Sequence, residues 1–203
     1  MNRLDKAVER FSSRCPIDVE WKPFQIDPGT AADGEEFEAY NRRRWGSSGW
    51  TNHLRREGKK DGANFANWKW WPNTLKSHQL VQYGLEKHQI PTNQMNRILF
   101  ESVYEEGENI SLTDTLIRIA QAHFSNWNWD ELRNYLEENE GAIQVQQDIA
   151  RGRRQYGISG VPFFVIGAYQ DGNKKGTPYG VSGAQSPSAL LNIFEELVGE
   201  DDE

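Results

Sequence analysis

The apolar residues near the start of the chain are spaced as on one face of a helix. They are Leu4, Ala7, Val8 and Phe11. This spacing of three and four residues predicts a helix over residues 2–13, which Cys15-Pro16 ends. Apolar and polar residues then alternate from Ile17 to Gln25, which predicts a strand.

The middle of the chain has the three-to-four-residue periodicity of helices almost throughout. The predicted helices cover residues 35–45, 48–60, 74–87, 91–103, 111–124, 128–136 and 141–156. Residues 62–71 are rich in Asn and Trp, and this composition predicts an irregular segment. The cluster of Trp68, Trp70 and Trp71 in it has two readings, core packing or a lid on the one hand and the lining of a substrate cleft on the other.

The pattern changes again near the end. Residues 161–166 are a short apolar run that contains Pro162, and residues 179–181 predict a second strand after a turn over residues 171–177. Ser186-Pro187 is typical of a helix start, and Leu190, Leu191, Phe194 and Leu197 give the last helix an apolar stripe. The order of elements is therefore helix, strand, helical block, hairpin, helix.

Four motifs along this order resemble the DsbA family of thioredoxin-like proteins. They are Trp21 to Pro28, Asn73-Thr74 with Ser77 to Leu80, Gly160 to Phe164, and Ser182 to Gln185. The branch that the chain most resembles contains FrnE-like proteins, 2-hydroxychromene-2-carboxylate isomerases and kappa-class glutathione transferases. The resemblance implies an α/β thioredoxin-like fold with a large all-helical insertion. It divides the chain into residues 1–28 and 155–203, the two thioredoxin-like parts, and residues 29–154, the insertion.

One part of the family pattern is missing from these 203 residues. In the family, a central strand and a Cys-Pro-x-Cys motif precede the first helix, and neither is present ahead of residue 2. Strands without ladder partners leave backbone groups unpaired at about 1–3 kcal/mol each. We therefore expect an upstream segment outside this sequence, a direct pairing of residues 17–25 with residues 163–166, or a strand supplied by a partner.

Composition narrows the classes of function. The net charge of -7 argues against general nucleic-acid binding, and no apolar run is long enough to span a membrane. We expect neither nucleic acid nor a membrane as partner. The charged start is not a signal peptide and the single cysteine rules out an intrachain disulfide within this sequence, which favours a cytoplasmic location.

The resemblance assigns the candidate binding residues. It implies a cis bond between Val161 and Pro162, with the backbone of Val161 facing a bound peptide or glutathione. Ser182 and Gly183 would present amides to a carboxylate, or form a turn that Ser186 follows as a helix cap. His78 is either a packing residue or a residue beside the active cleft.

No residue of this sequence is predicted to be catalytic. Cys15 follows its helix, where the negative end of the helix dipole disfavours a thiolate. The histidines show no spacing that suits metal ligands, so we predict no metal site and no cofactor.

Three functions remain open. By resemblance the chain is a thiol–disulfide oxidoreductase, but we expect residues 1–203 alone to give no disulfide turnover. The alternatives are a glutathione-dependent transferase or isomerase, and a non-catalytic protein that binds peptide or glutathione. The expected partners are a thiol or disulfide peptide or glutathione, the latter as a substrate, and a homodimer is a further expectation.

Overall fold

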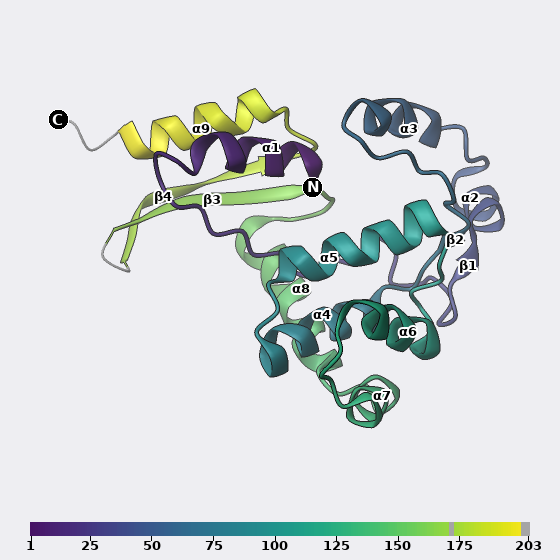
Figure 1. Ribbon diagram of the computed structural model, residues 1–203. Helices are drawn as coiled ribbons and strands as arrows, with labels where there is room; N and C mark the ends of the chain where they lie inside the picture. The colour runs from purple at the N-terminus through teal and green to yellow at the C-terminus, as the bar shows by residue number, and fades with distance from the viewer. Residues whose placement is uncertain (171–172, 200–203) are drawn as a thin grey trace. The chain divides into compact units, whose positions relative to one another are not determined.

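The computed structural model describes residues 1–170 and 173–199 and divides the chain into two compact units. The hairpin unit consists of residues 1–18 and 151–203, and the helical unit of residues 19–150. Figure 1 shows the elements of each unit along the chain. Helix α8 (Ala142–Tyr156) begins in the helical unit and ends in the hairpin unit.

The hairpin unit packs two helices against a two-stranded antiparallel sheet. Its elements are α1 (Asn2–Phe11), β3 (Phe163–Gln170), β4 (Asn173–Ser182) and α9 (Pro187–Gly199). The register pairs Phe163 with Ser182 and shifts after Ile166. Helices α1 and α9 lie side by side on the hairpin (Figure 1), and Phe11 meets Phe194 with ring centroids 5.5 Å apart. The apolar periodicity predicted both helices, and their stripes form this core.

The predicted strand over Ile17 to Gln25 is wrong. This segment is extended without a ladder, and among the described residues β3 pairs with β4 alone. The direct pairing of residues 17–25 with residues 163–166, one of the three alternatives, is therefore absent among the described residues. The alternation correctly predicted which positions from Ile17 to Lys22 are half-buried, and Ile17 and Ile166 both pack against the core of the hairpin unit.

Side chains bind the backbone of this segment in place of a neighbouring strand. The N–H of Trp21 donates to Oγ1 of Thr92 over 2.8 Å, and its indole Nε1 donates to Oδ1 of Asn93. The carbonyl of Phe24 accepts from Nε2 of His78. These bonds attach residues 19–28 to the helical unit, so the compact units divide after residue 18 and not at residue 28 as the sequence suggested.

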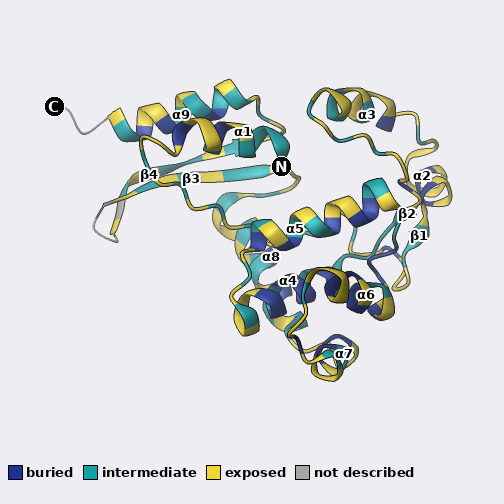
Figure 2. Ribbon diagram, viewed as in Figure 1, coloured by how far each residue is buried: buried dark blue, intermediate teal, exposed yellow. Residues whose placement is uncertain are grey.

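The helical unit is built around α4, whose buried face carries Leu80 and Tyr83. Its helices are α2 (Phe37–Trp45), α3 (Thr51–Lys60), α4 (Leu75–His88), α5 (Thr92–Glu101), the π-helical turn η1 (Ser102–Glu106), α6 (Thr113–His123) and α7 (Trp129–Glu137). Figure 2 shows the buried residues along the inner faces of α4, α5 and α6. Most of these helices were predicted from periodicity, because each of α4, α5, α6 and α7 buries an apolar stripe in a common core.

Two short strands, β1 (Glu35–Glu36) and β2 (Trp70–Trp71), pair in the helical unit. Helix α2 therefore begins two residues later than predicted, with the Glu36 carboxylate accepting from the N–H of Ala39. Of the tryptophans in the predicted irregular segment, Trp68 is 8 % exposed, and its ring stacks with that of Trp71 at a centroid distance of 6.1 Å. Trp71 also stacks on Tyr40 at 4.1 Å. Trp68 and Trp71 therefore belong to the aromatic packing of the helical unit.

Candidate functional site

The loop that leads into β3 is exposed and has free backbone groups. Val161 is 46 % exposed and joins Pro162 through a cis peptide bond. Among residues 1–170 and 173–199, nothing bonds to the N–H or C=O of Val161. An exposed residue with both backbone groups free can form hydrogen bonds with an extended peptide.

The structure brings the second predicted segment directly beside this loop. The N–H of Gly183 donates to the carbonyl oxygen of Pro162 over 2.9 Å, and Ser182 stands opposite Phe163 in the ladder. Gly183 has a φ of +85°, the left-handed conformation that favours glycine. Four of the five predicted site residues thus lie together at one end of the hairpin; we call Val161, Pro162, Ser182 and Gly183 the hairpin-end site.

The turn after β4 is closed by its own side chains. Nε2 of Gln185 donates to the carbonyl of Ser182 over 2.9 Å, and Oγ of Ser186 accepts from the N–H of Ala189 at the start of α9. The reading of this segment as a turn followed by a helix cap is therefore confirmed. Because the amide of Gly183 already binds Pro162, it would have to break that bond to hold a carboxylate.

His78, the fifth predicted residue, belongs to the helical unit. Its Nε2 lies 3.1 Å from the carbonyl oxygen of Phe24, so the ring must carry a proton on Nε2 to donate this bond. Burial lowers the pKa of His78 to about 4, against the smaller opposite effect of the Phe24 carbonyl. The ring is neutral at pH 7 and holds the extended segment in place, which is the packing role among the two alternatives.

Asn73 has a role that the motif alone did not reveal. Its Nδ2 donates to the carbonyl of Thr30 over 2.9 Å, and its Oδ1 accepts from the N–H of Leu75 and from Gln25. Its own N–H donates to Oγ of Ser111. The side chain of Asn73 therefore connects residues 25–30 with the start of α4, and its backbone N–H adds the loop before α6. Asn and Asp just before a helix are the sequence signal for such a role.

Cys15 lies in the hairpin unit, after α1 and not at a helix start. Its Sγ has the carbonyl of Pro16 as neighbour at 3.5 Å, and its side chain packs at the edge of the core. That Cys15 is an inert linker cysteine stays a prediction.

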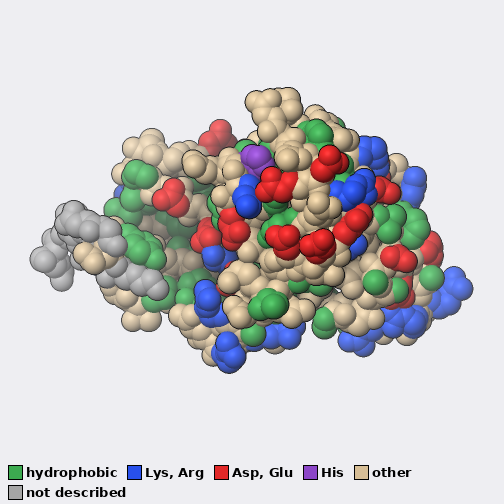
Figure 3. Space-filling model, turned by 90° about the horizontal axis from the view of Figure 1, so that it is seen from below, with side chains coloured by type: hydrophobic (Ala, Val, Ile, Leu, Met, Phe, Trp, Pro, Cys, Tyr) green, Lys and Arg blue, Asp and Glu red, His purple; other side chains and the backbone are tan. Residues whose placement is uncertain are grey.

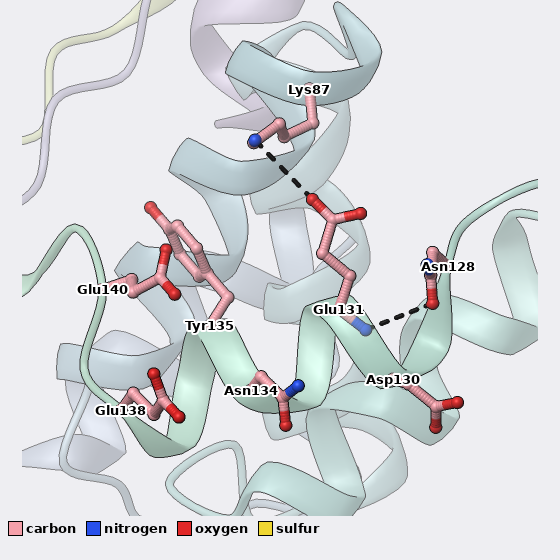
Figure 4. Close-up of a pocket in the computed structure, with 8 residues that line it drawn as sticks. All are labelled: Lys87, Asn128, Asp130, Glu131, Asn134, Tyr135, Glu138 and Glu140. Atoms are coloured by element: carbon pink, nitrogen blue, oxygen red, sulfur yellow. Dashed lines mark hydrogen bonds and ion pairs between the residues drawn. The ribbon is translucent and has the colours of Figure 1, made fainter.

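The helical unit has an acidic hollow of about 400 Å³ beside α7. Figure 4 shows its lining: Lys87, Asn128, Asp130, Glu131, Asn134, Tyr135, Glu138 and Glu140. Lys87 neutralises part of the charge through a 3.6 Å ion pair with Glu131. Asp and Glu side chains are prominent on the face seen in Figure 3. In the part of the chain that the structure describes, no group of three or more His, Cys, Asp or Glu is arranged to hold a metal ion.

A helix-backed β-hairpin that a cis proline precedes, with a mostly helical unit inserted in the sequence between its two parts, defines a thioredoxin-like protein with a helical insertion. The insertion is not all-helical as predicted, because the short strands β1 and β2 pair within it. The family model of the DSBA-like thioredoxin domain matches residues 1–195, and the chain belongs to this family of thiol–disulfide oxidoreductases. Comparison with curated proteins gives no match. Among the described residues, no helix has the length and apolar character needed to cross a membrane.

Proposed function

We propose that the hairpin-end site binds an extended, thiol-containing peptide segment through the backbone of Val161. The observation that carries this proposal is the pair of free backbone groups on an exposed residue, next to the bond between Gly183 and Pro162. A peptide laid along Val161 would gain hydrogen bonds at both groups, as an added strand does. The side chain of Val161 would contribute apolar contact to whatever residue lies above it.

Peptide is favoured over glutathione as the ligand. A glutathione-binding site needs amides for the γ-glutamyl carboxylate, and the amide of Gly183 is already engaged. Ser186 likewise occupies the N–H of Ala189 at the start of α9. The FrnE-like branch therefore fits these residues better than the glutathione-dependent transferases and isomerases, which remain the alternative.

We further propose that residues 1–203 do not by themselves turn over disulfides. Exchange requires a thiolate that attacks one sulfur of a substrate disulfide, forms a mixed disulfide and releases the other sulfur as a thiolate. A second thiol must then resolve the mixed disulfide, and this sequence has one cysteine. These residues would then serve to bind a thiol or disulfide partner, in the cytoplasm and as a monomer or homodimer.

Binding is tested by titrating the isotope-labelled chain with a blocked cysteine-containing peptide and, separately, with reduced glutathione. We expect the peptide to shift the amide resonances of Val161 and its neighbours. Val161→Pro removes the N–H and should abolish the shifts, whereas the matched Val161→Ala keeps the N–H and should retain most of the binding. Peptide binding that survives Val161→Pro would contradict the backbone role.

Turnover is tested by insulin reduction with dithiothreitol as reductant. We expect the rate to equal that of dithiothreitol alone for the chain and for Cys15→Ser. Catalysis that survives Cys15→Ser would contradict the absence of turnover. Tight binding of glutathione without turnover would instead favour the glutathione-dependent alternative.

A further inference from the structure

Residues 42–60 form an exposed basic arm on the helical unit. It comprises the last turn of α2, the connecting turn and α3, and Thr51 is the one buried residue of α3. Three large apolar side chains are exposed along it: Trp45 at 51 %, Trp50 at 45 % and Leu54 at 41 %. In the main core of the unit, by contrast, Trp68 and Leu80 are almost wholly buried.

The inner side of the arm is fixed by specific contacts. Arg55 donates to the carbonyl of Phe65 over 2.7 Å, and its guanidinium lies 5.4 Å from the ring of Trp68. Trp50 donates through Nε1 to Oδ1 of Asn41 over 2.7 Å. These contacts anchor α3 through one side and leave the rest of the helix facing outward.

The three apolar side chains are close enough to act together. Trp50 and Leu54 are four residues apart and therefore share one side of the helical turn. The ring of Trp45 meets that of Trp50 edge-on at 6.4 Å. The guanidinium of Arg44 lies 4.7 Å above the ring of Trp45. The arm thus presents an aromatic stripe with a cation resting on one end.

The arm is positively charged although the chain as a whole is acidic. Residues 42–60 contain seven Arg and Lys against one Glu, whereas the whole chain has a net charge of -7. Among the residues that the structure describes, Arg42, Arg56 and Lys59 form no ion pair and are exposed. Their charge is therefore available to an anionic partner.

We propose that the basic arm docks on an anionic phospholipid bilayer surface. Tryptophan and basic side chains that project from a helix suit the boundary between headgroups and acyl chains, where the indole ring and the cations are both accommodated. Trp45, Leu54 and the uncovered part of Trp50 are exposed on a segment whose helix has one buried residue, and such a protrusion fits a fluid surface better than a rigid groove does. The sequence predicted no membrane partner because it contains no segment long enough to span a membrane. Docking on the bilayer surface does not need such a segment.

The proposal predicts binding that is reversible and sensitive to salt, because few apolar side chains insert and the charges are exposed. The test is co-sedimentation of the full chain with vesicles of phosphatidylcholine and phosphatidylserine, and with vesicles of phosphatidylcholine alone. We expect binding to the first, weakened by added sodium chloride, and little binding to the second. The emission of tryptophan should shift to the blue when the anionic vesicles bind.

Two double variants separate the contribution of the basic side chains from that of the apolar side chains. Arg56→Glu with Lys59→Glu should lower the partition coefficient more than about tenfold. Trp45→Ala with Leu54→Ser should reduce the blue shift, of which Trp50 retains a part. The matched control is Arg153→Glu with Arg154→Glu, which changes the charge equally on α8 and should leave binding close to that of the parent chain. Circular dichroism checks that each variant folds.

Three outcomes would overturn the proposal. One is no binding to anionic vesicles at low salt. The second is equal loss in the α8 control, which would mean that net charge alone matters. The third is binding of poly-L-glutamate to the arm without binding of vesicles, which would identify an acidic protein as the partner.

Discussion

The N–H of Gly183 donates to the carbonyl oxygen of Pro162 over 2.9 Å, and this bond joins the two ends of the hairpin-end site. Gly183 needs a positive φ of +85° to make it, and nothing lies within 4 Å of the position that a Cβ would take. Gly183→Ala should therefore cost about 1–2 kcal/mol through backbone strain alone. Urea denaturation measures it. The control is Gly160→Ala, where space is equally open and φ is not positive. An equal loss of stability in this control would contradict strain at a positive φ as the cause.

His78 should make stability depend on pH. Its pKa is about 4 in the folded chain and about 6.5 unfolded, so the unfolded chain takes up the proton first as pH falls. Stability is thus fully present above pH 6.5 and is lost as pH falls toward 4, by about 3 kcal/mol.

His78→Gln keeps an N–H for the carbonyl of Phe24 and does not titrate. We expect urea midpoints of this variant to vary less between pH 4 and pH 6.5 than those of the parent chain. A pH dependence identical to that of the parent would mean that other groups account for it.

Asn73→Ala should destabilise the helical unit by about 2–3 kcal/mol, because the carbonyl of Thr30 and the N–H of Leu75 lose a partner. Asn73→Asp keeps the acceptor for the N–H of Leu75, so its stability should lie between that of the parent chain and that of Asn73→Ala. Hydrogen exchange should rise at the start of α4. Asn52→Ala, at an exposed position on α3, should change the free energy of unfolding by less than about 0.5 kcal/mol.

Glu105 holds a loop through three backbone donors. Its carboxylate accepts from the N–H groups of Asn64, Phe65 and Ala66 at 2.8, 3.0 and 3.2 Å. Glu105→Gln replaces one oxygen by an NH₂ that cannot accept, and should cost about 1–3 kcal/mol. Faster amide exchange at these residues is the direct readout. The neighbouring exposed Glu106→Gln should be neutral, and a comparable loss there would point to net charge instead.

Gly141 touches Tyr135. A Cβ at Gly141 would lie 2.1 Å from the Tyr135 hydroxyl oxygen, and φ is +75°. Gly141→Ala should cost about 3 kcal/mol from clash and strain together. Gly46→Ala has the same sign of φ and open space around it, so it should show the strain without the clash.

The double variant Gly141→Ala with Tyr135→Phe should recover part of this loss. The Tyr135 hydroxyl is buried without a hydrogen-bond partner among the described residues, so Tyr135→Phe alone should be close to neutral. A double variant no more stable than Gly141→Ala would mean that the hydroxyl is not the obstacle.

The sequence by itself determined most of the helices and the family. Leu4 to Phe11 and Leu190 to Leu197 carry apolar stripes that any folded chain must bury, and the motifs around Pro162 and Ser182 lie in the family order. The hairpin was predicted from two apolar runs around a turn, but β4 begins at Asn173, inside the turn predicted over residues 171–177. Residues 171 and 172 of that predicted turn lie outside the described residues.

Only the tertiary structure decided where the extended segment belongs. Alternation shows that residues 17–25 are extended and half-buried, but it cannot say whether a strand or a side chain will bind their backbone. Thr92 and His78, both distant in sequence, satisfy Trp21 and Phe24, and no local pattern in either helix predicts this. The same holds for the exposure of Trp45 and Trp50, because burial of an aromatic residue depends on which neighbours the fold brings to it.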